Sequence, residues 1–196
     1  MKNLRAIIFG IMAVLLMLII ENNTVKAVCS PPPNDLGGVV GEWSDIECCD
    51  LEVNINGIIC TYHVCYYWRT PGITSLELEL YVCNDYQAQE PCDHDQIATG
   101  HDIQMYLAEQ IMKQNCNQNL WLCPPCPIQN PNFRVWLGAC VDYNNYPPTY
   151  CPNPTAFCKQ EYTFCCDNFG QRILTPVGDT ETVGACTGGC TVRCEN

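Results

Sequence analysis

Two cysteines in the second half of the chain have a spacing that is used for redox chemistry. Cys123 and Cys126 enclose two prolines, which gives the C-x-x-C pattern of thiol–disulfide oxidoreductases. Such a site needs a βαβ context and a helix after the first cysteine, which lowers the pKa of its thiol. Here prolines fill the spacer and also follow it. We therefore expect Cys123 and Cys126 to be structural cysteines.

A second group has the side chains of a metal site. Asp93, His94, Asp95 and His101 lie within nine residues of one another. They do not form an EF-hand loop, because Ala98 stands at the position where that loop requires glycine. The sequence also lacks the H-E-x-x-H motif of zinc proteases. We predict no metal and no cofactor, and it stays open whether these four residues hold a cation or form a solvated polar loop.

Nucleophilic catalysis has little support in the sequence. The three serines, Ser30, Ser44 and Ser75, lie outside any G-x-S-x-G motif. A cysteine nucleophile needs a free thiolate beside a histidine, whereas all eighteen cysteines of this chain can pair. Pairs of Asp and Glu could still support glycoside hydrolysis, because acidic residues abound. We predict that the protein is not an enzyme and keep a small secreted hydrolase as an alternative.

An aromatic stretch, residues 143–150 (YNNYPPTY), lies between Cys140 and Cys151. A bridge between these two cysteines would display the stretch as a closed loop that prolines stiffen. Tyrosine and asparagine suit recognition, because they offer contact area and hydrogen bonds at a low entropic cost. The alternative is that the rings lie flat over the sheet as a small additional core. The predicted binding residues are Tyr143, Asn145, Tyr146 and Tyr150.

The best-defined structural element is a hairpin over Glu47–Arg69. Asn56-Gly57 is the favoured pair for a two-residue type I′ turn, because both central residues need a positive φ. This turn fixes a register in which one face is apolar and the other polar. The register places Cys48 opposite Cys65 in a non-hydrogen-bonded pair, where Cα atoms lie about 4.5 Å apart. We predict a bridge between them.

The same register turns two further cysteines of the hairpin, Cys49 and Cys60, toward the core. They must therefore pair with cysteines outside the hairpin. Residues 75–82 (SLELELYV) alternate strictly and predict a third strand, with leucines facing inward and with Glu77 and Glu79 facing outward. Hairpin and strand together predict an antiparallel meander.

Further elements follow along the chain. Helical periodicity over residues 102–117 predicts a helix that packs across the sheet and that Cys116 fastens there. Residues 132–142 alternate as a strand, and residues 161–167 and 172–175 flank a second turn. The fold class we expect is mainly β (α+β): a small disulfide-rich antiparallel β meander or sandwich with one helix packed on the sheet.

The N-terminal segment has the features of a secretory signal. Lys2 and Arg5 precede an apolar run over residues 6–20, and Ala27 ends a short polar stretch. The run of fifteen residues is shorter than the ~20 residues that span a bilayer, although an uncleaved anchor remains the alternative. We predict a signal peptide over residues 1–27 and one disulfide-stapled domain over residues 28–196, which is secreted to an extracellular or periplasmic location.

The cysteine count agrees with export. All eighteen cysteines lie in the predicted mature chain, and such a density is typical of disulfide scaffolds in oxidising compartments. An even number allows nine bridges with no free thiol. The cysteines predicted to form disulfides are Cys29, Cys48, Cys49, Cys60, Cys65, Cys83, Cys92, Cys116, Cys123, Cys126, Cys140, Cys151, Cys158, Cys165, Cys166, Cys186, Cys190 and Cys194.

Charge narrows the choice of partners. The whole chain carries a formal net charge of −12. Removing Lys2, Arg5, Lys26 and Glu21 with the signal leaves six basic and twenty acidic residues, a net charge of −14. Nucleic acids and anionic lipids both require basic surfaces. We therefore predict no nucleic acid partner and no membrane contact after signal cleavage, and expect a protein or glycan partner at the cell surface.

These features favour a secreted, disulfide-stabilised binding or structural module. Such a protein would be a surface, matrix or appendage component that recognises a glycan or a protein through its loops. The alternatives are the small hydrolase with paired carboxylates and a secreted inhibitor or toxin, which size and disulfide density would also suit. A rigid exposed loop would favour the inhibitor.

Overall fold

The computed structural model describes most of the chain after residue 28. The described residues are 29–38, 41–55, 57–70, 77–84, 87–88, 92, 100–114, 116, 123–126, 133–144, 149–151 and 154–194. The predicted signal peptide lies outside them. Within the described residues, no helix is long and apolar enough to cross a membrane.

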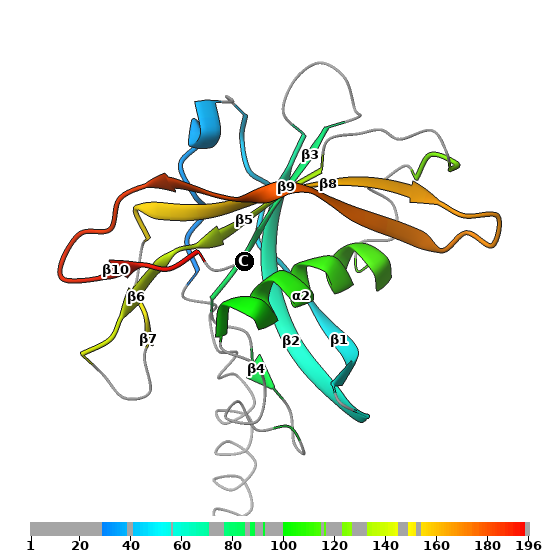
Figure 1. The fold of residues 1–196 in the computed structure, drawn as a ribbon, viewed down its shortest axis with the longest axis horizontal. Helices are drawn as coiled ribbons and strands as arrows, with labels where there is room; N and C mark the ends of the chain where they lie inside the picture. Colours follow the sequence, from blue (N-terminus) through cyan, green and yellow to red (C-terminus); the bar gives the residue numbers. More distant parts are fainter. Residues whose placement is uncertain are drawn as a thin grey trace, which may run out of the picture.

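Over the described residues the fold is mostly β with one α-helix, as predicted (Figure 1). A short 3-10 turn, η1 (Leu36–Gly38), precedes the sheets, and the helix is α2 (Gly100–Gln114). The main sheet contains β1 (Glu47–Ile55), β2 (Ile58–Arg69), β3 (Leu78–Val82), β4 (Gln87–Ala88), β5 (Phe133–Gly138), β8 (Ala156–Cys166) and β9 (Arg172–Gly184). A small sheet contains β6 (Cys140–Asp142), β7 (Thr149–Tyr150) and β10 (Thr191–Val192).

The main sheet has the strand order β1-β2-β3-β5-β8-β9, with β4 paired to β2. Its first three strands form the predicted antiparallel meander. The expectation of an entirely antiparallel sheet is wrong at one place, because β3 and β5 pair in parallel. The chain between these strands contains α2, and a parallel pair needs such a long crossover. The strand predicted over 132–142 divides at Ala139 into β5 and β6, which belong to different sheets.

The first hairpin has the predicted register. Ile55 lies opposite Ile58, and Cys48 lies opposite Cys65, to which it is bonded. Gly57 has a φ of 89°, and its N–H donates to the side-chain oxygen of Asn54 at 2.9 Å. The turn residues thus set the pairing of both strands.

The helix covers one face of the main sheet, where the larger core lies (Figure 1). The apolar side of α2 meets alternate residues of the strands, as helix and strand periodicities require. Cys49 of β1 is bonded to Cys116 just beyond the helix, and Cys60 of β2 to Cys92. Fully buried members of this core are Leu51, Tyr62, Val64, Leu80, Val82, Leu107, Ile111, Phe133, Val135 and Leu137.

The N-terminal segment covers the opposite face. Cys29 is bonded to Cys83, and the segment packs Leu36 and Trp43 into a second, smaller core. The other members of that core come from the strands or directly follow one: Cys65, Tyr67, Tyr81, Cys83, Trp136 and Phe157. Tyr67 is only 7% exposed. Its hydroxyl donates to the carbonyl oxygen of Cys29 at 2.9 Å.

A buried ion pair joins this segment to the sheet. Arg69 and Glu79 are cross-strand neighbours on the second face, 1% and 0% exposed, with Nε of Arg69 2.6 Å from Oε2 of Glu79. The same guanidinium donates to the carbonyl oxygens of Asn34, Leu36 and Gly41 at 2.6, 2.8 and 3.2 Å. The prediction that Glu79 faces solvent is therefore wrong. Strand alternation placed it on the face away from the main core, but the N-terminal segment covers that face.

The ion pair continues across the sheet as a row of alternating charges. Arg134 of β5 contacts Oε1 of Glu79 at 3.1 Å and Oε1 of Glu161 at 3.2 Å. Lys159 then contacts Glu161 at 3.4 Å and Glu181 of β9 at 2.7 Å. The contacts link β2, β3, β5, β8 and β9, and they become more exposed toward β9. We call this row the charge ladder.

Breaking the buried end of the charge ladder should strongly destabilise the protein. We expect Glu79→Gln to lower the free energy of unfolding by about 3–5 kcal/mol, because it leaves the Arg69 guanidinium buried without its counter-charge. Lys113→Gln is the control, since it removes a partly exposed i,i+4 pair with Glu109 that contributes about 0.5 kcal/mol. Chemical denaturation with the disulfides intact measures both. Equal losses in the two variants would contradict the buried role of Glu79.

The exposed end of the ladder makes stability depend on acid pH. Partial burial raises the pKa of Glu161, but the charge of Lys159 and the hydrogen bond from Arg134 outweigh burial and hold the pKa below its ordinary value of 4.5. The stabilisation is therefore present above pH 4.5 and is lost as the pH falls through the lowered pKa. Glu161→Gln should flatten this loss in denaturation curves recorded between pH 2 and 7, a range of about five units. Asp179→Asn, at an exposed carboxylate of β9, should not.

Candidate functional site

The tyrosine-rich stretch forms the connection between β6 and β7. These strands pair Val141 with Tyr150 and Asp142 with Thr149, so the small sheet supports both ends of the loop. Tyr143 is 49% exposed, whereas Tyr150 is partly buried in β7. The other two predicted binding residues, Asn145 and Tyr146, lie outside the described residues.

The bridge considered for this loop, Cys140–Cys151, is wrong. Cys140 is bonded to Cys186 and Cys151 to Cys190. The N–H of Cys151 donates to the carbonyl oxygen of Cys140 at 2.9 Å, which makes the two residues a hydrogen-bonded pair with Cα atoms about 5.5 Å apart. Their side chains reach the C-terminal tail, which pairs with β6 through β10. The loop is still clamped, but by two bridges to the tail.

The C-x-x-C segment, Cys123–Cys126, holds the end of β8 beside the turn between β8 and β9. Cys123 is bonded to Cys166 and Cys126 to Cys165, so both cysteines are structural, as predicted. The backbone pairs as well: the N–H of Cys166 donates to the carbonyl oxygen of Pro124 at 2.8 Å, and that of Cys126 donates to the carbonyl oxygen of Cys166 at 2.9 Å. Two bridges and two backbone hydrogen bonds therefore fix the end of β8, next to the turn into β9.

That turn presents one aromatic ring. The side-chain Oδ1 of Asp167 accepts hydrogen bonds from the N–H groups of Phe169 and Gln171, both at 2.8 Å. Gly170 adopts a φ of 77°, and its N–H donates to the carbonyl oxygen of Asp167 at 3.0 Å. Phe169 is 89% exposed at the tip. The turn was predicted from the sequence, but Phe169 was not among the predicted binding residues. Its signal in the sequence is a large aromatic residue in an Asn-Phe-Gly turn one residue after paired cysteines.

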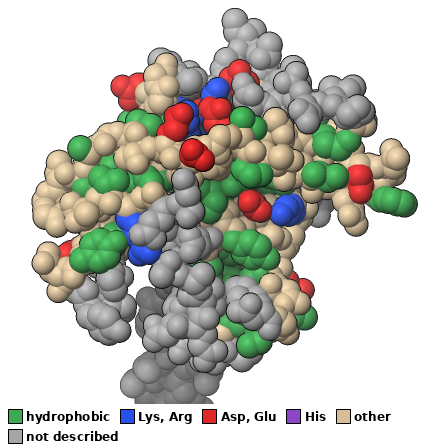
Figure 2. Space-filling model, viewed as in Figure 1, with side chains coloured by type: hydrophobic (Ala, Val, Ile, Leu, Met, Phe, Trp, Pro, Cys, Tyr) green, Lys and Arg blue, Asp and Glu red, His purple; other side chains and the backbone are tan. Residues whose placement is uncertain are grey.

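The surroundings of the tip are partly apolar. Ile173 of β9, which lies near the tip, is 45% exposed, whereas Val177 lies farther along the strand opposite Glu161 and is 46% exposed. Figure 2 shows hydrophobic side chains at the end of the β8–β9 hairpin, and Figure 1 places that end opposite β6 and β7 along the length of the molecule. An open depression of about 580 Å³ adjoins the tip, lined by Lys113, Cys123, Cys166, Gly170, Gln171 and Arg172.

The side chains of the four candidate cation residues all lie outside the described part of the chain, so their arrangement stays a prediction. Asp93, His94 and Asp95 lie outside the described residues, and His101 lies in the first turn of α2 with its side chain outside them. Among the described residues, Cys48, His63 and Cys65 bring their ligand-type atoms within 4.8 Å of one another. The two sulfur atoms are bonded to each other, so this group is a disulfide beside an imidazole.

The bridges define the class of the protein. All eighteen cysteines pair, and the remaining bridge, Cys158–Cys194, joins β8 to the tail. Nine disulfides on a small mixed sheet identify a disulfide-stabilised domain of an extracellular or periplasmic compartment. Comparison with known protein families, curated proteins and solved structures finds no match.

Peptide mapping under non-reducing conditions tests the two clamps. We expect fragments that join Cys123 to Cys166 and Cys126 to Cys165, and fragments that join Cys140 and Cys151 to the tail. Tandem mass spectrometry separates the bridges of the adjacent cysteines. A Cys123–Cys126 bridge would instead revive the redox interpretation of the C-x-x-C segment.

Proposed function

We propose that the protein is a non-catalytic extracellular binding module that recognises a partner protein through its disulfide-clamped loop tips. The observation that carries this proposal is the exposure of Phe169 at the tip of a turn that two bridges and the hydrogen bonds of Asp167 and Cys166 hold in place. The β6–β7 loop, with Tyr143 exposed, is a second contact of the same kind at the other end of the molecule.

Rigidity matters because binding must offset the entropy of ordering the interface, about 0.5–1.5 kcal/mol for each immobilised flexible side chain. The Asp167 hydrogen bonds and the flanking bridges order the tip before any partner arrives. A phenylalanine then contributes about 150–250 Å² of apolar area, and aromatic anchors of this kind dominate many interfaces. An exposed ring also contributes little to folding, so its binding role can be tested separately from stability.

The acidic net charge of the protein supports a partner with a basic surface. The net charge of −12 gives the protein an acidic field, which favours association with basic surfaces and disfavours acidic ones. We therefore propose a partner protein with a basic surface around an apolar pocket. A glycan partner is the alternative within this proposal.

A secreted inhibitor is the second candidate function, and one observation favours it specifically. The Asp167–Gln171 turn is a rigid exposed loop with one large apolar side chain at its apex, the shape that can occupy the specificity pocket of a protease. A protease panel distinguishes the two proposals, since an inhibitor would slow a protease in proportion to its occupancy.

The hydrolase alternative has less support. Among the described residues, Glu79 and Glu161 are neighbouring carboxylates, and both accept hydrogen bonds from Arg134. Glycosidases instead use one carboxyl group that keeps its proton and one that is ionised. We propose that these carboxylates hold strands together.

Phe169→Ala tests the binding proposal. The purified protein is screened against arrays of extracellular proteins and glycans, and each ligand found is measured by surface plasmon resonance. We expect Phe169→Ala to weaken binding by about 2 kcal/mol or more, as for a hot-spot residue, with an unchanged melting temperature. Val177→Ala is the matched control, because it removes an exposed apolar side chain of β9 away from the tip.

Two outcomes would contradict the proposal. Equal affinities of the Phe169→Ala and Val177→Ala variants would remove the tip from the interface. Turnover of a substrate in a hydrolase panel, without any ligand on the arrays, would favour the enzyme alternative.

A further inference from the structure

One of the nine disulfides differs from the others in its surroundings. All eighteen cysteines are among the described residues, and Cys48 alone among them is exposed. Its partner Cys65 is buried, 6% exposed, in the core beneath the N-terminal segment. The bridge therefore has one sulfur-bearing residue open to solvent and one covered by protein.

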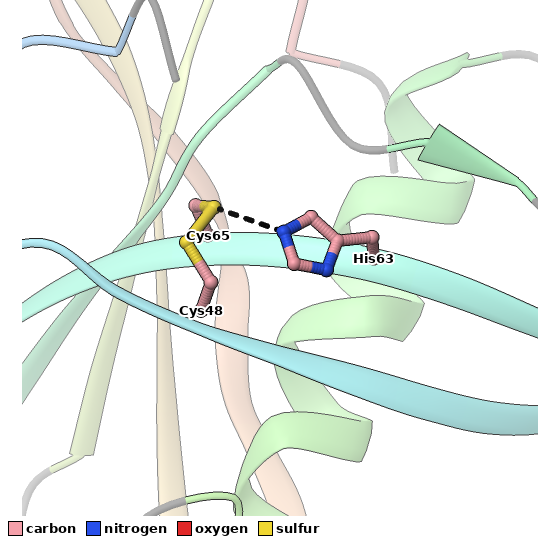
Figure 3. Close-up of side chains that lie close together, drawn as sticks. All are labelled: Cys48, His63 and Cys65. Carbon is pink, nitrogen blue, oxygen red and sulfur yellow. Dashed lines mark hydrogen bonds between the residues drawn. A yellow bond between two sulfur atoms is a disulfide. The ribbon is translucent and has the colours of Figure 1, made fainter. Parts of the chain in front are cut away.

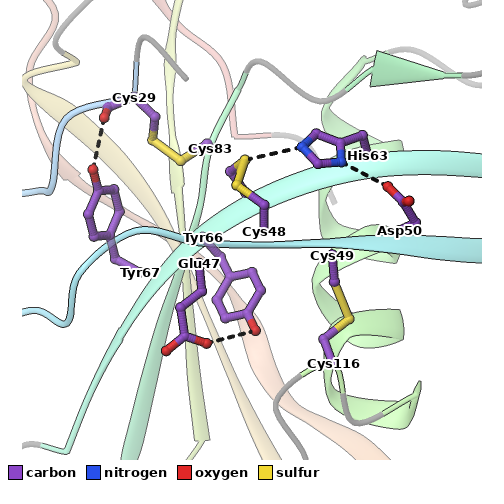
Figure 4. The surroundings of a disulfide bond; sticks show 11 residues. Cys29, Glu47, Cys48, Cys49, Asp50, His63, Tyr66, Tyr67, Cys83 and Cys116 are labelled. Atoms are coloured by element: carbon purple, nitrogen blue, oxygen red, sulfur yellow. Dashed lines mark hydrogen bonds and ion pairs between the residues drawn. A yellow bond between two sulfur atoms is a disulfide. The ribbon is translucent and has the colours of Figure 1, made fainter. Parts of the chain in front are cut away.

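A histidine and an aspartate stand next to this bridge. The hairpin register pairs Asp50 with His63, two residues along from the Cys48–Cys65 pair, so all four side chains lie on one face. Nδ1 of His63 lies 2.8 Å from Oδ1 of Asp50, and Nε2 of His63 lies 3.9 Å from Sγ of Cys65 (Figures 3 and 4). A carboxylate accepts and does not donate, so Nδ1 carries a proton and Nε2 is the nitrogen that faces the sulfur.

We propose that Cys48–Cys65 is a thiol-exchange site, at which a low-molecular-weight thiol attacks Cys48 and His63 assists the departure of Cys65. Exchange rates depend on access to the attacked sulfur and on stabilisation of the leaving thiolate. The exposure of Cys48 meets the first requirement, and the imidazole beside Cys65 meets the second. Asp50 is a positioning residue, because it orients the ring and balances the charge of an imidazolium.

The exchange is balanced in two steps. The first thiol loses its proton to solvent, and Nε2 of His63 takes up a proton from solvent, which makes the ring an imidazolium. The thiolate of the first thiol forms a bond to Sγ of Cys48, the Cys48–Cys65 bond breaks, and Cys65 leaves as a thiolate that takes this proton from Nε2 of His63. A second thiolate attacks the sulfur of the bound thiol and releases Cys48, which takes a proton from solvent. Two thiols are thereby oxidised to one external disulfide, and their two electrons and two protons reduce the protein bridge.

The fold around the site can survive this reaction. β1 remains bonded to the helix end through Cys49–Cys116, which lies on the other face of the strand (Figure 4), and β2 remains bonded through Cys60–Cys92. The backbone pairing of β1 with β2 continues on both sides of the Cys48–Cys65 pair. The protein would therefore keep one fold whether the Cys48–Cys65 bridge is oxidised or reduced, which suits a reversible exchange.

Glutathione is the probe that tests the order of opening. The native full-length protein is incubated with increasing glutathione, quenched with iodoacetamide and digested for mass spectrometry. We expect Cys48 and Cys65 to be labelled before any other cysteine, with a trapped glutathione adduct on Cys48. Earlier opening of another bridge, or an adduct mainly on Cys65, would overturn the proposal.

Variants of His63 and Asp50 test whether these residues assist the departure of Cys65. His63→Gln should slow the opening of this bridge about tenfold, less than the hundredfold that a well-placed proton donor can contribute, and Asp50→Asn should slow it by a smaller factor. Glu52→Gln is the matched control, because it removes the same charge from an exposed position of the same strand face. The readout is the opening rate relative to the next bridge in the same sample, which cancels any general loss of stability. Equal relative rates in all three variants would exclude a role for His63.

Discussion

The burial of both faces of the main sheet depends on the contact between Arg69 and Glu79. A sheet that is covered on both faces needs a layer on each face. One layer is α2, whose backbone groups form hydrogen bonds within the helix. The other is the irregular, proline-rich N-terminal segment, whose carbonyl groups need donors once they are buried. The guanidinium of Arg69 supplies these donors, and Glu79 balances its charge. The segment can therefore cover aromatic residues without regular structure of its own.

Features that depend on neighbouring residues could be predicted from the sequence. The Asn56-Gly57 turn fixed the register of the first hairpin, and the register gave the Cys48–Cys65 bridge. The strand before Cys83 and the helix around Leu107 followed from their periodicities. In each case a few adjacent residues carry the information, because a turn type or a repeat of apolar positions allows a single local conformation.

Features that depend on distant segments could not be predicted. Strand alternation places Glu79 on the outward face, and nothing near it in the chain indicates that residues 29–38 and 41–43 cover that face. The parallel pairing of β3 with β5 and the partners of Cys140 and Cys151 likewise depend on the path of the whole chain. Phe169 was missed for another reason: an apolar residue in a turn is interpreted as part of the core until its exposure is known.

The bridges of the tail have a consequence for how the protein is made. During vectorial export the N-terminal hairpin emerges first, and its bridge spans only 17 residues. Cys140, Cys151 and Cys158 pair with Cys186, Cys190 and Cys194, so their thiols must wait until these later residues have been exported. In the meantime they can be captured by wrong partners such as one another. Maturation of this protein should therefore depend on disulfide isomerase activity in the compartment that receives it.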